Sequence, residues 1–308
     1  MSRGALLLAY GGPASPGEVR PFVESVLRER PASAGLVDEI VRRYGEIGGA
    51  SPLPAATAAL GAALARELGG RGIPAPVFVG MRFGAPAIGD ALAAARAQGV
   101  DRLAVLVLAP HRAAATREAY AEAVELARRE ARADGPALSW GASWFDHAGF
   151  VDALADRVKE AVARVPAAGE PGAAWLVTAH SLPGAERGVA TYAGDLKATG
   201  TALAARFGDH AWRAAYQSRS PRGAEPWLGP AVLDAIREAA AARSPAILAV
   251  PAGFVADNLE VLWDLDVEAA RVSADSGVPF VRAGTVGTHP GFVRALADAA
   301  LAVLGEDG

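Results

Sequence analysis

Apolar residues along the chain fall into short continuous runs, and each run is followed by a segment with the periodicity of an amphipathic helix. Runs of roughly four to eight apolar residues have the length of buried strands, and their alternation with helices is typical of βαβ units in a parallel sheet. The pattern therefore predicts an α/β fold. The predicted strands cover residues 5–9, 77–81, 103–109, 174–178, 214–217 and 247–251.

The predicted helices lie between these strands and in a few longer connections. They cover residues 16–30, 34–47, 54–69, 85–97, 115–133, 150–165, 190–207, 230–242, 257–273 and 290–304.

The order of motifs in the first part of the chain is repeated in the second part. One strand runs into Ala9-Tyr10 and ends at Pro13, and another runs into Ala179-His180 and ends at Pro183. A segment rich in Pro, Gly and Ala, residues 166–172, separates the two parts.

We therefore expect two Rossmann-like domains, an N-terminal half over residues 1–165 and a C-terminal half over 173–308, with the last helix able to pack back on the N-terminal half. Their parallel sheets are expected to be related by a pseudo-dyad. Ligands of α/β proteins bind beyond the carboxyl ends of parallel strands, so Tyr10 and His180 are expected to face each other across a cleft between the halves.

Composition narrows the class of protein. With 30 basic and 34 acidic residues, the formal net charge is −4, which gives no support to nucleic-acid binding. The chain has no cysteine, which excludes disulfides, zinc–thiolate sites and cysteine-ligated iron–sulfur clusters. No apolar stretch is long enough for a membrane span, and the first apolar run is too short for a signal peptide. We expect a cytoplasmic protein without an integral membrane segment.

His180 is the first candidate for a catalytic residue. It follows an apolar strand and precedes a turn, and histidine is the side chain most easily poised as a base near neutral pH. An isolated histidine at a strand end is more often structural than catalytic, so a catalytic role requires partners.

Three carboxylates provide such partners. Glu260, Asp264 and Glu268 recur at spacings of four, which places them in one row on a helix. A row of this kind is either a solvated acidic face or a path for a divalent cation or for protons. Like charges at this spacing destabilise a helix, and the flanking residues are apolar, which favours the path.

A third stretch, residues 42–53, joins a helix end with arginines to a glycine-rich turn and a Ser-Pro helix start. Its backbone N–H groups, Ser51 and Arg43 are suited to hold an anion such as a carboxylate. The alternative is simple helix capping, and the pattern alone leaves both open.

These stretches together resemble the ferrochelatase family over nearly the whole chain. The matching pieces include Ala9-Tyr10-Gly11-Gly12-Pro13, Ala179-His180-Ser181-Leu182-Pro183, Tyr216-Gln217-Ser218-Arg219 and the segment from Gly253 to Glu260. The resemblance implies a chelatase-type fold, with a porphyrin held in the cleft, and a lyase of haem biosynthesis.

The resemblance also implies roles for individual residues. His180 and Glu260 match the catalytic pair, and Asp264 and Glu268 match an acidic row for metal entry, so that all four are expected to contact the metal. Tyr10 matches a residue on the opposite face of the ring that ligates iron in the product, as in the soluble bacterial branch that acts on coproporphyrin III.

Further residues match positions that contact the porphyrin propionates. Leu27 stands where an arginine is common, with Arg28 and Arg30 close by, so that Arg28 is included. The expected porphyrin-binding residues are Tyr10, Arg28, Arg43, Ser51 and Tyr120. A second departure is Asn258, where the family usually has a histidine, and the loop after His111 has fewer hydroxyls than usual.

The expected substrates are coproporphyrin III and Fe²⁺, the product is coproheme, and we expect no resident cofactor and a monomer. Three alternatives remain: a ferrochelatase for protoporphyrin IX, a tetrapyrrole chelatase for cobalt or nickel, and a non-catalytic porphyrin or haem carrier. The carrier would need to have lost the base or the carboxylate, and both His180 and Glu260 are present.

Overall fold

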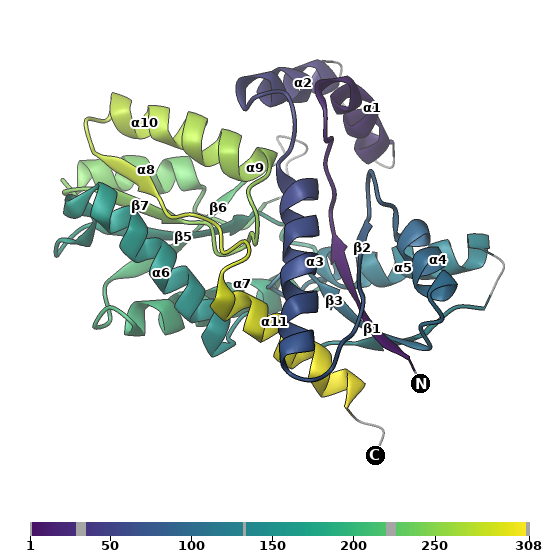
Figure 1. Cartoon of the computed structure of the whole chain (residues 1–308). Helices are drawn as coiled ribbons and strands as arrows, with labels where there is room; N and C mark the ends of the chain where they lie inside the picture. Colours follow the sequence, from purple (N-terminus) through teal and green to yellow (C-terminus); the bar gives the residue numbers. More distant parts are fainter. Residues whose placement is uncertain (1, 29–34, 132–133, 220–225, 306–308) are drawn as a thin grey trace. The chain divides into compact units, whose positions relative to one another are not determined.

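The computed structural model describes residues 2–28, 35–131, 134–219 and 226–305 (Figure 1). Within these ranges the chain forms two compact units, each with a four-stranded parallel sheet. Of the described residues, unit 1 comprises 2–28, 35–109, 115–131, 134–144 and 287–305, and unit 2 comprises 110–114, 145–219 and 226–286.

The sheet of unit 1 has the strand order β2-β1-β3-β4. Leu6 and Leu8 of the buried strand β1 point to one face of this sheet, whereas Leu7 points to the other, as a strand requires. The strands are β1 (Arg3–Ala9), β2 (Val77–Met81), β3 (Arg102–Val107) and β4 (Ala137–Trp140).

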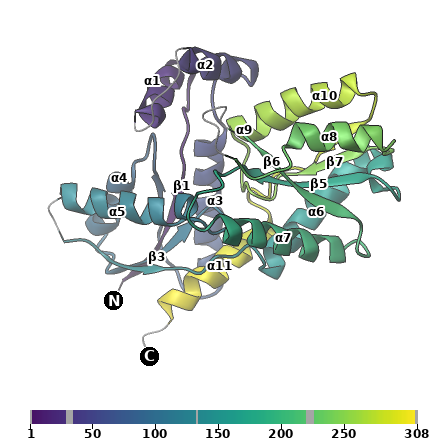
Figure 2. The same cartoon turned by 180° about the vertical axis from the view of Figure 1, so that it is seen from behind.

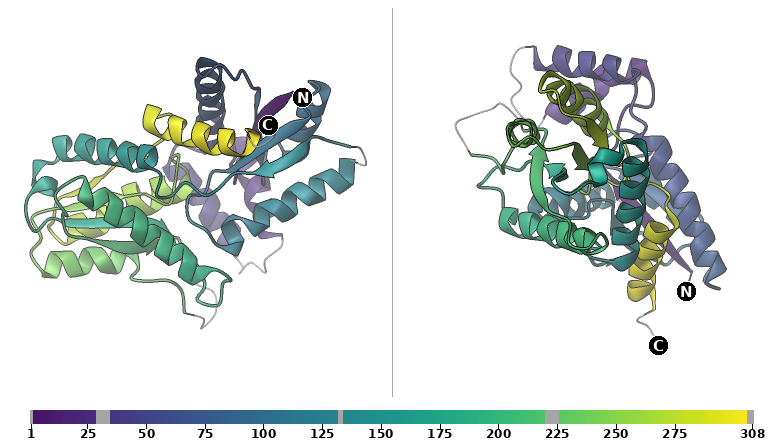
Figure 3. Two further views of the ribbon diagram at one scale, coloured as in Figure 1. Left: turned by 90° about the horizontal axis from the view of Figure 1, so that it is seen from below. Right: turned by 90° about the vertical axis from the view of Figure 1, so that its left-hand side faces the viewer.

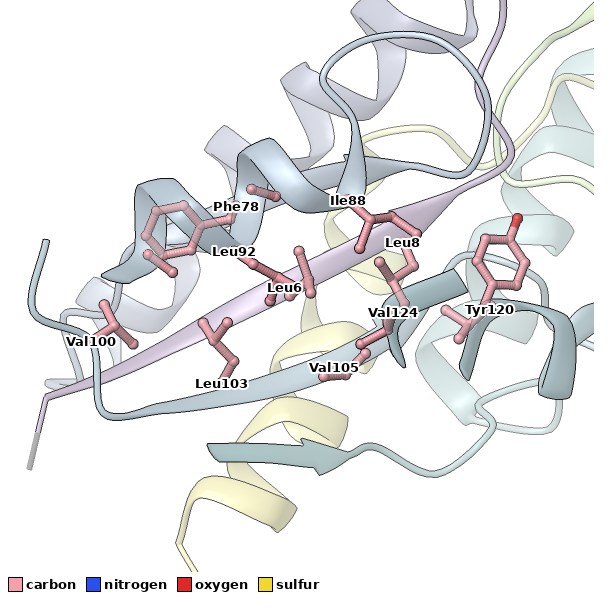
Figure 4. Close-up of a cluster of buried hydrophobic side chains, with 13 residues drawn as sticks. Leu6, Leu8, Phe78, Ile88, Leu92, Val100, Leu103, Val105, Tyr120 and Val124 are labelled. Carbon is pink, nitrogen blue, oxygen red and sulfur yellow. The ribbon is translucent and has the colours of Figure 1, made fainter. Parts of the chain in front are cut away.

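Helices cover both faces of the sheet in unit 1. α4 (Ile88–Ala97) and α5 (Glu118–Ala131) pack over Leu6 and Leu8 in a cluster of buried side chains (Figure 4). Each fully buried leucine in such a cluster contributes roughly 1.5–3 kcal/mol.

The second face of this sheet is covered by two helices from distant parts of the chain. α3 (Leu53–Gly70) contacts β1 and β2, and α11 (Pro290–Leu304) contacts β3 and β4. The two helices lie side by side, as Figure 3 shows for the yellow α11 and the dark blue α3. α1 (Pro16–Leu27) and α2 (Leu36–Glu46) pack on each other within the same unit.

The sheet of unit 2 has the equivalent order, β6-β5-β7-β8. β5 and β7 occupy the centre and are almost entirely buried, which matches the apolar runs that predicted them. The strands are β5 (Ala174–His180), β6 (Trp212–Gln217), β7 (Ile247–Val250) and β8 (Phe280–Arg282).

Two layers of helices enclose this second sheet (Figure 2). α6 (Ala148–Arg164) and α7 (Val189–Ala205) pack on each other and contact the strands from one side. α8 (Val232–Ala241) lies on the opposite face together with a composite helix. The composite helix consists of α9 (Leu259–Val261), a π-helical segment η3 (Leu262–Ala269) and α10 (Ala270–Asp275).

The α/β class, the parallel sheets and all six predicted strands are confirmed. The shared strand order of the two sheets agrees with the repeated order of motifs in the sequence. β4 and β8 were not predicted, because they are short edge strands with few buried residues. The connections also contain the short 3₁₀ turns η1 (Ala114–Thr116) and η2 (Pro166–Gly169).

The contacts divide the chain at a different point from the segment 166–172. α6 precedes that segment, yet it packs on α7, β7 and β8 and therefore belongs to unit 2. α11 belongs to unit 1 because its contacts are with α3 and β3. A composition of Pro, Gly and Ala marks a turn, but it does not reveal on which side of the turn a helix finds its packing partner. No helix among the described ranges is both long and apolar enough to cross a membrane.

Candidate active site

The candidate site lies at the carboxyl ends of β5, β6 and β7 in unit 2. The amide of Ser181 donates to the carbonyl of Gln217 at 2.8 Å, and the amide of Gly253 donates to the carbonyl of Thr178 at 2.9 Å. These two bonds continue the sheet past the last paired residues. A Cβ atom at Gly253 would lie 2.7 Å from the Cβ of Ala179, so only glycine permits this approach.

His180 and Glu260 form the centre of the site. The Nε2 atom of His180 lies 3.4 Å from Oε1 of Glu260, and the two side chains are 36% and 38% exposed. The Nδ1–H group of His180 donates to the carbonyl oxygen of Ser181, which leaves Nε2 to face the carboxylate.

The carboxylate changes the proton affinity of this histidine. Burial lowers the pKa of His180, but the charge of Glu260, the hydrogen bonds to Glu260 and Ser181 and the charge of Asp264 together raise it to about 9. The imidazole is therefore protonated at neutral pH in the free protein.

Two side chains fix the backbone of Glu260. The Oδ1 atom of Asn258 accepts hydrogen bonds from the amides of Glu260 at 2.9 Å and Val261 at 3.2 Å, which makes Asn258 the N-cap of α9. The Nε2 group of Gln217 donates to the carbonyl of Glu260 at 2.7 Å. The amide that replaces the usual histidine thus has a defined role in orienting the catalytic candidate.

The acidic row runs along the π-helical segment. Hydrogen bonds from i to i+5 put more than four residues in each turn, so side chains at spacings of four lie more nearly in line than on an α-helix. Asp264 is buried and accepts a hydrogen bond from the hydroxyl of Ser218, whereas Glu260 and Glu268 are partly exposed. Within the ranges that the structure describes, no group of three or more histidine and acidic side chains is close enough to hold a metal ion.

Two buried rings, those of Tyr192 and His111, pack together, and Tyr192 contacts the backbone of His180. The hydroxyl of Tyr192 donates to the carbonyl oxygen of His180 at 3.1 Å, and burial raises the pKa of Tyr192, which keeps this donor protonated. The rings of His111 and Tyr192 pack edge-to-face with their centroids 5.6 Å apart. The Nε2 atom of His111 lies 3.2 Å from the hydroxyl oxygen of Thr199. Burial lowers the pKa of His111 to about 3, so this ring is neutral.

Unit 1 contains the candidates for contact with the porphyrin. Tyr10 directly follows β1 and is 43% exposed. Its ring packs against that of Phe83, with the ring centroids 5.0 Å apart. Ser51 is buried, and its amide donates to the carbonyl of Pro13 at 2.8 Å. A Cβ atom at Gly12 would lie 2.7 Å from the Ser51 hydroxyl, so the glycine brings the Tyr10 loop and the Ser51 turn together.

Tyr120 belongs to the same region of unit 1. It is buried at the beginning of α5, with its hydroxyl directed away from Leu8 and Val124 (Figure 4). Burial raises the pKa of Tyr120, with a smaller upward effect of Tyr10 and a downward effect of Arg82.

The two arginine candidates lie on the neighbouring helices. Arg28 is exposed at the end of α1, and Arg43 in α2 forms an ion pair with Glu39 of the same helix. Arg30 lies outside the described residues. The structure thus groups Tyr10, Ser51 and Tyr120 in unit 1, and His180, Glu260 and Asp264 in unit 2.

Sequence reasoning did not assign roles to Gln217, Ser218 and Tyr192. Gln217 and Ser218 stood in a matching motif after a predicted strand, which was the available signal for them. Tyr192 had no signal, because it acts through a backbone carbonyl that any residue could offer.

Solved chelatase structures share this fold. The sirohydrochlorin chelatase SirB from Bacillus subtilis subspecies spizizenii, determined with cobalt, matches with a TM-score of 0.58 and 14% identity, covering 100% of this chain and 98% of its own. CbiX, described as the terminal enzyme for siroheme biosynthesis in denitrifying bacteria, matches with a TM-score of 0.54 and 16% identity, covering 97% and 99%. The fold is therefore that of the chelatase class.

Sequence comparison identifies the family within this class. The family model for ferrochelatase matches residues 2–303, and the chain belongs to the ferrochelatase family. It is 36% identical over 299 residues to the coproporphyrin III ferrochelatase of Nocardia farcinica, covering 94% of this chain and 84% of the relative. The relative of the same name from Mycobacterium ulcerans is 37% identical over 292 residues, covering 94% and 83%. A protein named ferrochelatase from Rhodopirellula baltica is 34% identical over 290 residues, covering 94% and 82%.

Proposed function

We propose that this protein inserts Fe²⁺ into coproporphyrin III to give coproheme. The observation that carries the proposal is the pair of His180, at the end of β5, and Glu260, in α9, which lie 3.4 Å apart, with the carboxylates of Asp264 and Glu268 along the π-helical segment that follows. Family membership supports metal insertion into a porphyrin, and the names of the relatives from Nocardia and Mycobacterium support coproporphyrin III as the substrate.

The reaction exchanges two pyrrole protons for one divalent cation, so the site must accept protons and admit a metal ion. His180 accepts a pyrrole proton once its own proton has left, and its raised pKa makes it a strong acceptor in the neutral form. Glu260 assists, either as the second acceptor or as a transient ligand of Fe²⁺ through a carboxylate oxygen.

The remaining carboxylates provide the route for the displaced protons and for the hydrated cation. Asp264 is held by Ser218, and Glu268 lies one step further along the π-helical segment. Tyr10, Ser51 and Tyr120 contribute to binding the macrocycle, and Arg28 and Arg43 pair with its propionates. Tyr10 is assigned to the axial position of the product iron.

The proposal includes a monomeric, cytoplasmic protein without a resident cofactor. The chain contains no cysteine, so an iron–sulfur cluster held by cysteine is excluded. Size-exclusion chromatography with light scattering measures the oligomeric state directly.

The test is anaerobic mixing of the protein with Fe²⁺ and either coproporphyrin III or protoporphyrin IX, followed by the loss of free-porphyrin absorbance. The expected result is fast turnover with coproporphyrin III. Turnover only with protoporphyrin IX would refute the substrate, turnover only with Co²⁺ or Ni²⁺ would refute the metal, and porphyrin binding without turnover would identify a carrier.

The role of His180 is tested separately with His180→Ala. Loss of the base is expected to lower kcat by about 100-fold or more, with porphyrin binding retained. His210→Ala is the matched control, because His210 stacks on Trp175 in the same unit and makes no contact with the candidate site in the described residues. Wild-type turnover in His180→Ala would refute the assignment.

A further inference from the structure

Arg282, the last residue of β8, joins two acidic side chains of the composite-helix region. Its Nε and Nη2 groups donate to the two carboxylate oxygens of Asp266 at 2.7 and 2.8 Å. Its Nη1 and Nη2 groups also donate to Asp257 at 3.2 and 3.4 Å. The Arg282 side chain is only 13% exposed, and the planar guanidinium suits this two-sided pairing better than an ammonium group would.

Asp257 and Asp266 lie close in sequence to Glu260 and Asp264, but neither is among the proposed catalytic or metal-binding residues. Asp257 directly precedes the N-cap Asn258, and the hydroxyl of Thr285 donates to it at 3.0 Å. Asp266 lies within the π-helical segment, two residues beyond Asp264. Residues two apart point to nearly opposite sides of a helix, so Asp266 faces away from the row that Asp264 belongs to.

The composite helix is consequently held by side-chain contacts to both edges of the sheet in unit 2. Asp264 accepts a hydrogen bond from Ser218, which follows the edge strand β6, and Asp266 pairs with Arg282 on the opposite edge strand β8. Two ties on opposite sides of a helix resist its rotation about its own axis.

Rotation matters here because the segment is π-helical. Such segments are rare, since bonding from i to i+5 is less favourable than the α-helical pattern. Relaxation to an α-helix would turn every later residue relative to Glu260 and would break the alignment of the carboxylate row.

We propose that Arg282 is a positioning residue for metal insertion, whose bridge to Asp257 and Asp266 holds the π-helical segment in the register that aligns Glu260, Asp264 and Glu268. The inference rests on the proposed function. It assigns to Arg282 an effect on the metal side of the reaction and none on porphyrin binding.

The test compares Arg282→Met with Arg213→Met. Arg213 is a suitable control because it also lies on an edge strand, β6, and joins Glu238 at 2.6 Å and the carbonyl of Ala235 at 2.6 Å, but holds no part of the composite helix. KM for Fe²⁺, kcat and the dissociation constant of coproporphyrin III are measured for each variant. For Arg282→Met, kcat/KM for Fe²⁺ is expected to fall by about 10-fold or more, as for outer partners of metal ligands, with porphyrin affinity unchanged.

A second set of variants separates positioning from general stability. Asp266→Asn is expected to reproduce the defect, and the double variant is expected to be no worse than Arg282→Met, because both changes break the same bridge. If Arg282→Met does not fold, Asp266→Asn and Arg282→Lys provide the same comparison.

Two outcomes would overturn the inference and are distinguishable from each other. If the wild-type protein inserts no metal, the proposed function fails and the inference fails with it. If the wild type is active but both Arg282→Met and Asp266→Asn match Arg213→Met in kcat/KM for Fe²⁺, only the inference fails.

Discussion

The Nε2 atom of His180 lies 3.4 Å from Oε1 of Glu260, although one residue ends a strand and the other begins a helix. This proximity raises the pKa of His180 to about 9 despite the opposing effect of burial. In the reaction proposed above, a protonated imidazole could not accept a pyrrole proton, so the pair would have to release its own proton first. A divalent cation that reaches Glu260 would remove the attraction that retains this proton, which couples metal entry to the appearance of the base.

The pair also makes stability depend on pH. The folded-state pKa of His180 is raised from 6.5 to about 9, so folding favours the protonated ring. This contribution to stability is fully present below pH 6.5 and is lost as the pH rises through about 9. We predict that Tm of the wild type falls more steeply between pH 6.5 and 9.5 than Tm of Glu260→Gln, in which the attraction is absent.

Thermal unfolding of both proteins across this range measures the difference, and the other titrating groups cancel in the comparison. Parallel curves for the two proteins would show that Glu260 does not perturb the histidine.

Asn258 is predicted to support the position of Glu260 through its cap. Asn258→Ala removes the acceptor for the amides of Glu260 and Val261, and N-cap losses cost about 0.5–2 kcal/mol. We expect a lower Tm together with slower metal insertion. Asn258→Asp retains an acceptor and serves as the control, with Tm close to the wild type. Equal Tm for Asn258→Ala and the wild type would argue against the cap.

The central parts of the fold could be predicted from the sequence because their physical cause is local. Strands buried on both faces, such as β1 and β5, are continuous apolar runs, and period and length identify them. β8 has three residues and only one that is buried, so no such signal exists for it. The packing partner of α6 depends on tertiary contacts, which periodicity does not record.

The site shows the same division between local and non-local causes. Spacing placed Glu260, Asp264 and Glu268 in a row, but nothing in that spacing distinguishes an α-helix from the π-helical segment that is present. The hydrogen bond from Gln217 to Glu260 joins segments that are distant in sequence. The cap formed by Asn258 is local, but it depends on the backbone geometry at the start of the helix. The sequence pattern singled out His180 and the carboxylate row, and the resemblance to a family then matched His180 and Glu260 to a catalytic pair, but neither gives the distance of 3.4 Å between them.

Gly253 is predicted to be intolerant of any side chain. A methyl group there would lie 2.7 and 2.8 Å from the Cβ and Cα atoms of Ala179, the residue before His180. Gly253→Ala must displace backbone at the site, and we expect a destabilisation of about 1–3 kcal/mol with reduced insertion of Fe²⁺.

The matched control for this substitution is Gly194→Ala in α7. A Cβ atom at Gly194 meets nothing within 4 Å, and alanine in a helix is favoured over glycine by about 0.5–1 kcal/mol. Thermal unfolding is expected to move in opposite directions for the two variants. An unchanged or higher Tm for Gly253→Ala would contradict the close approach.

Tyr192 is predicted to position His180 through the main chain. Tyr192→Phe removes the hydroxyl that donates to the carbonyl of His180 at 3.1 Å and leaves that oxygen without this partner, at a cost of about 1 kcal/mol. Because the hydrogen bond holds the backbone of the proposed base rather than a substrate group, kcat should fall severalfold while the KM values for porphyrin and Fe²⁺ stay near the wild type. Steady-state kinetics on both substrates gives the two parameters.

Tyr216→Phe is the control, since the Tyr216 hydroxyl makes no hydrogen bond to the described part of the chain although burial raises its pKa in the same way. The same kcat in Tyr192→Phe and Tyr216→Phe would show that the hydrogen bond has no part in the reaction.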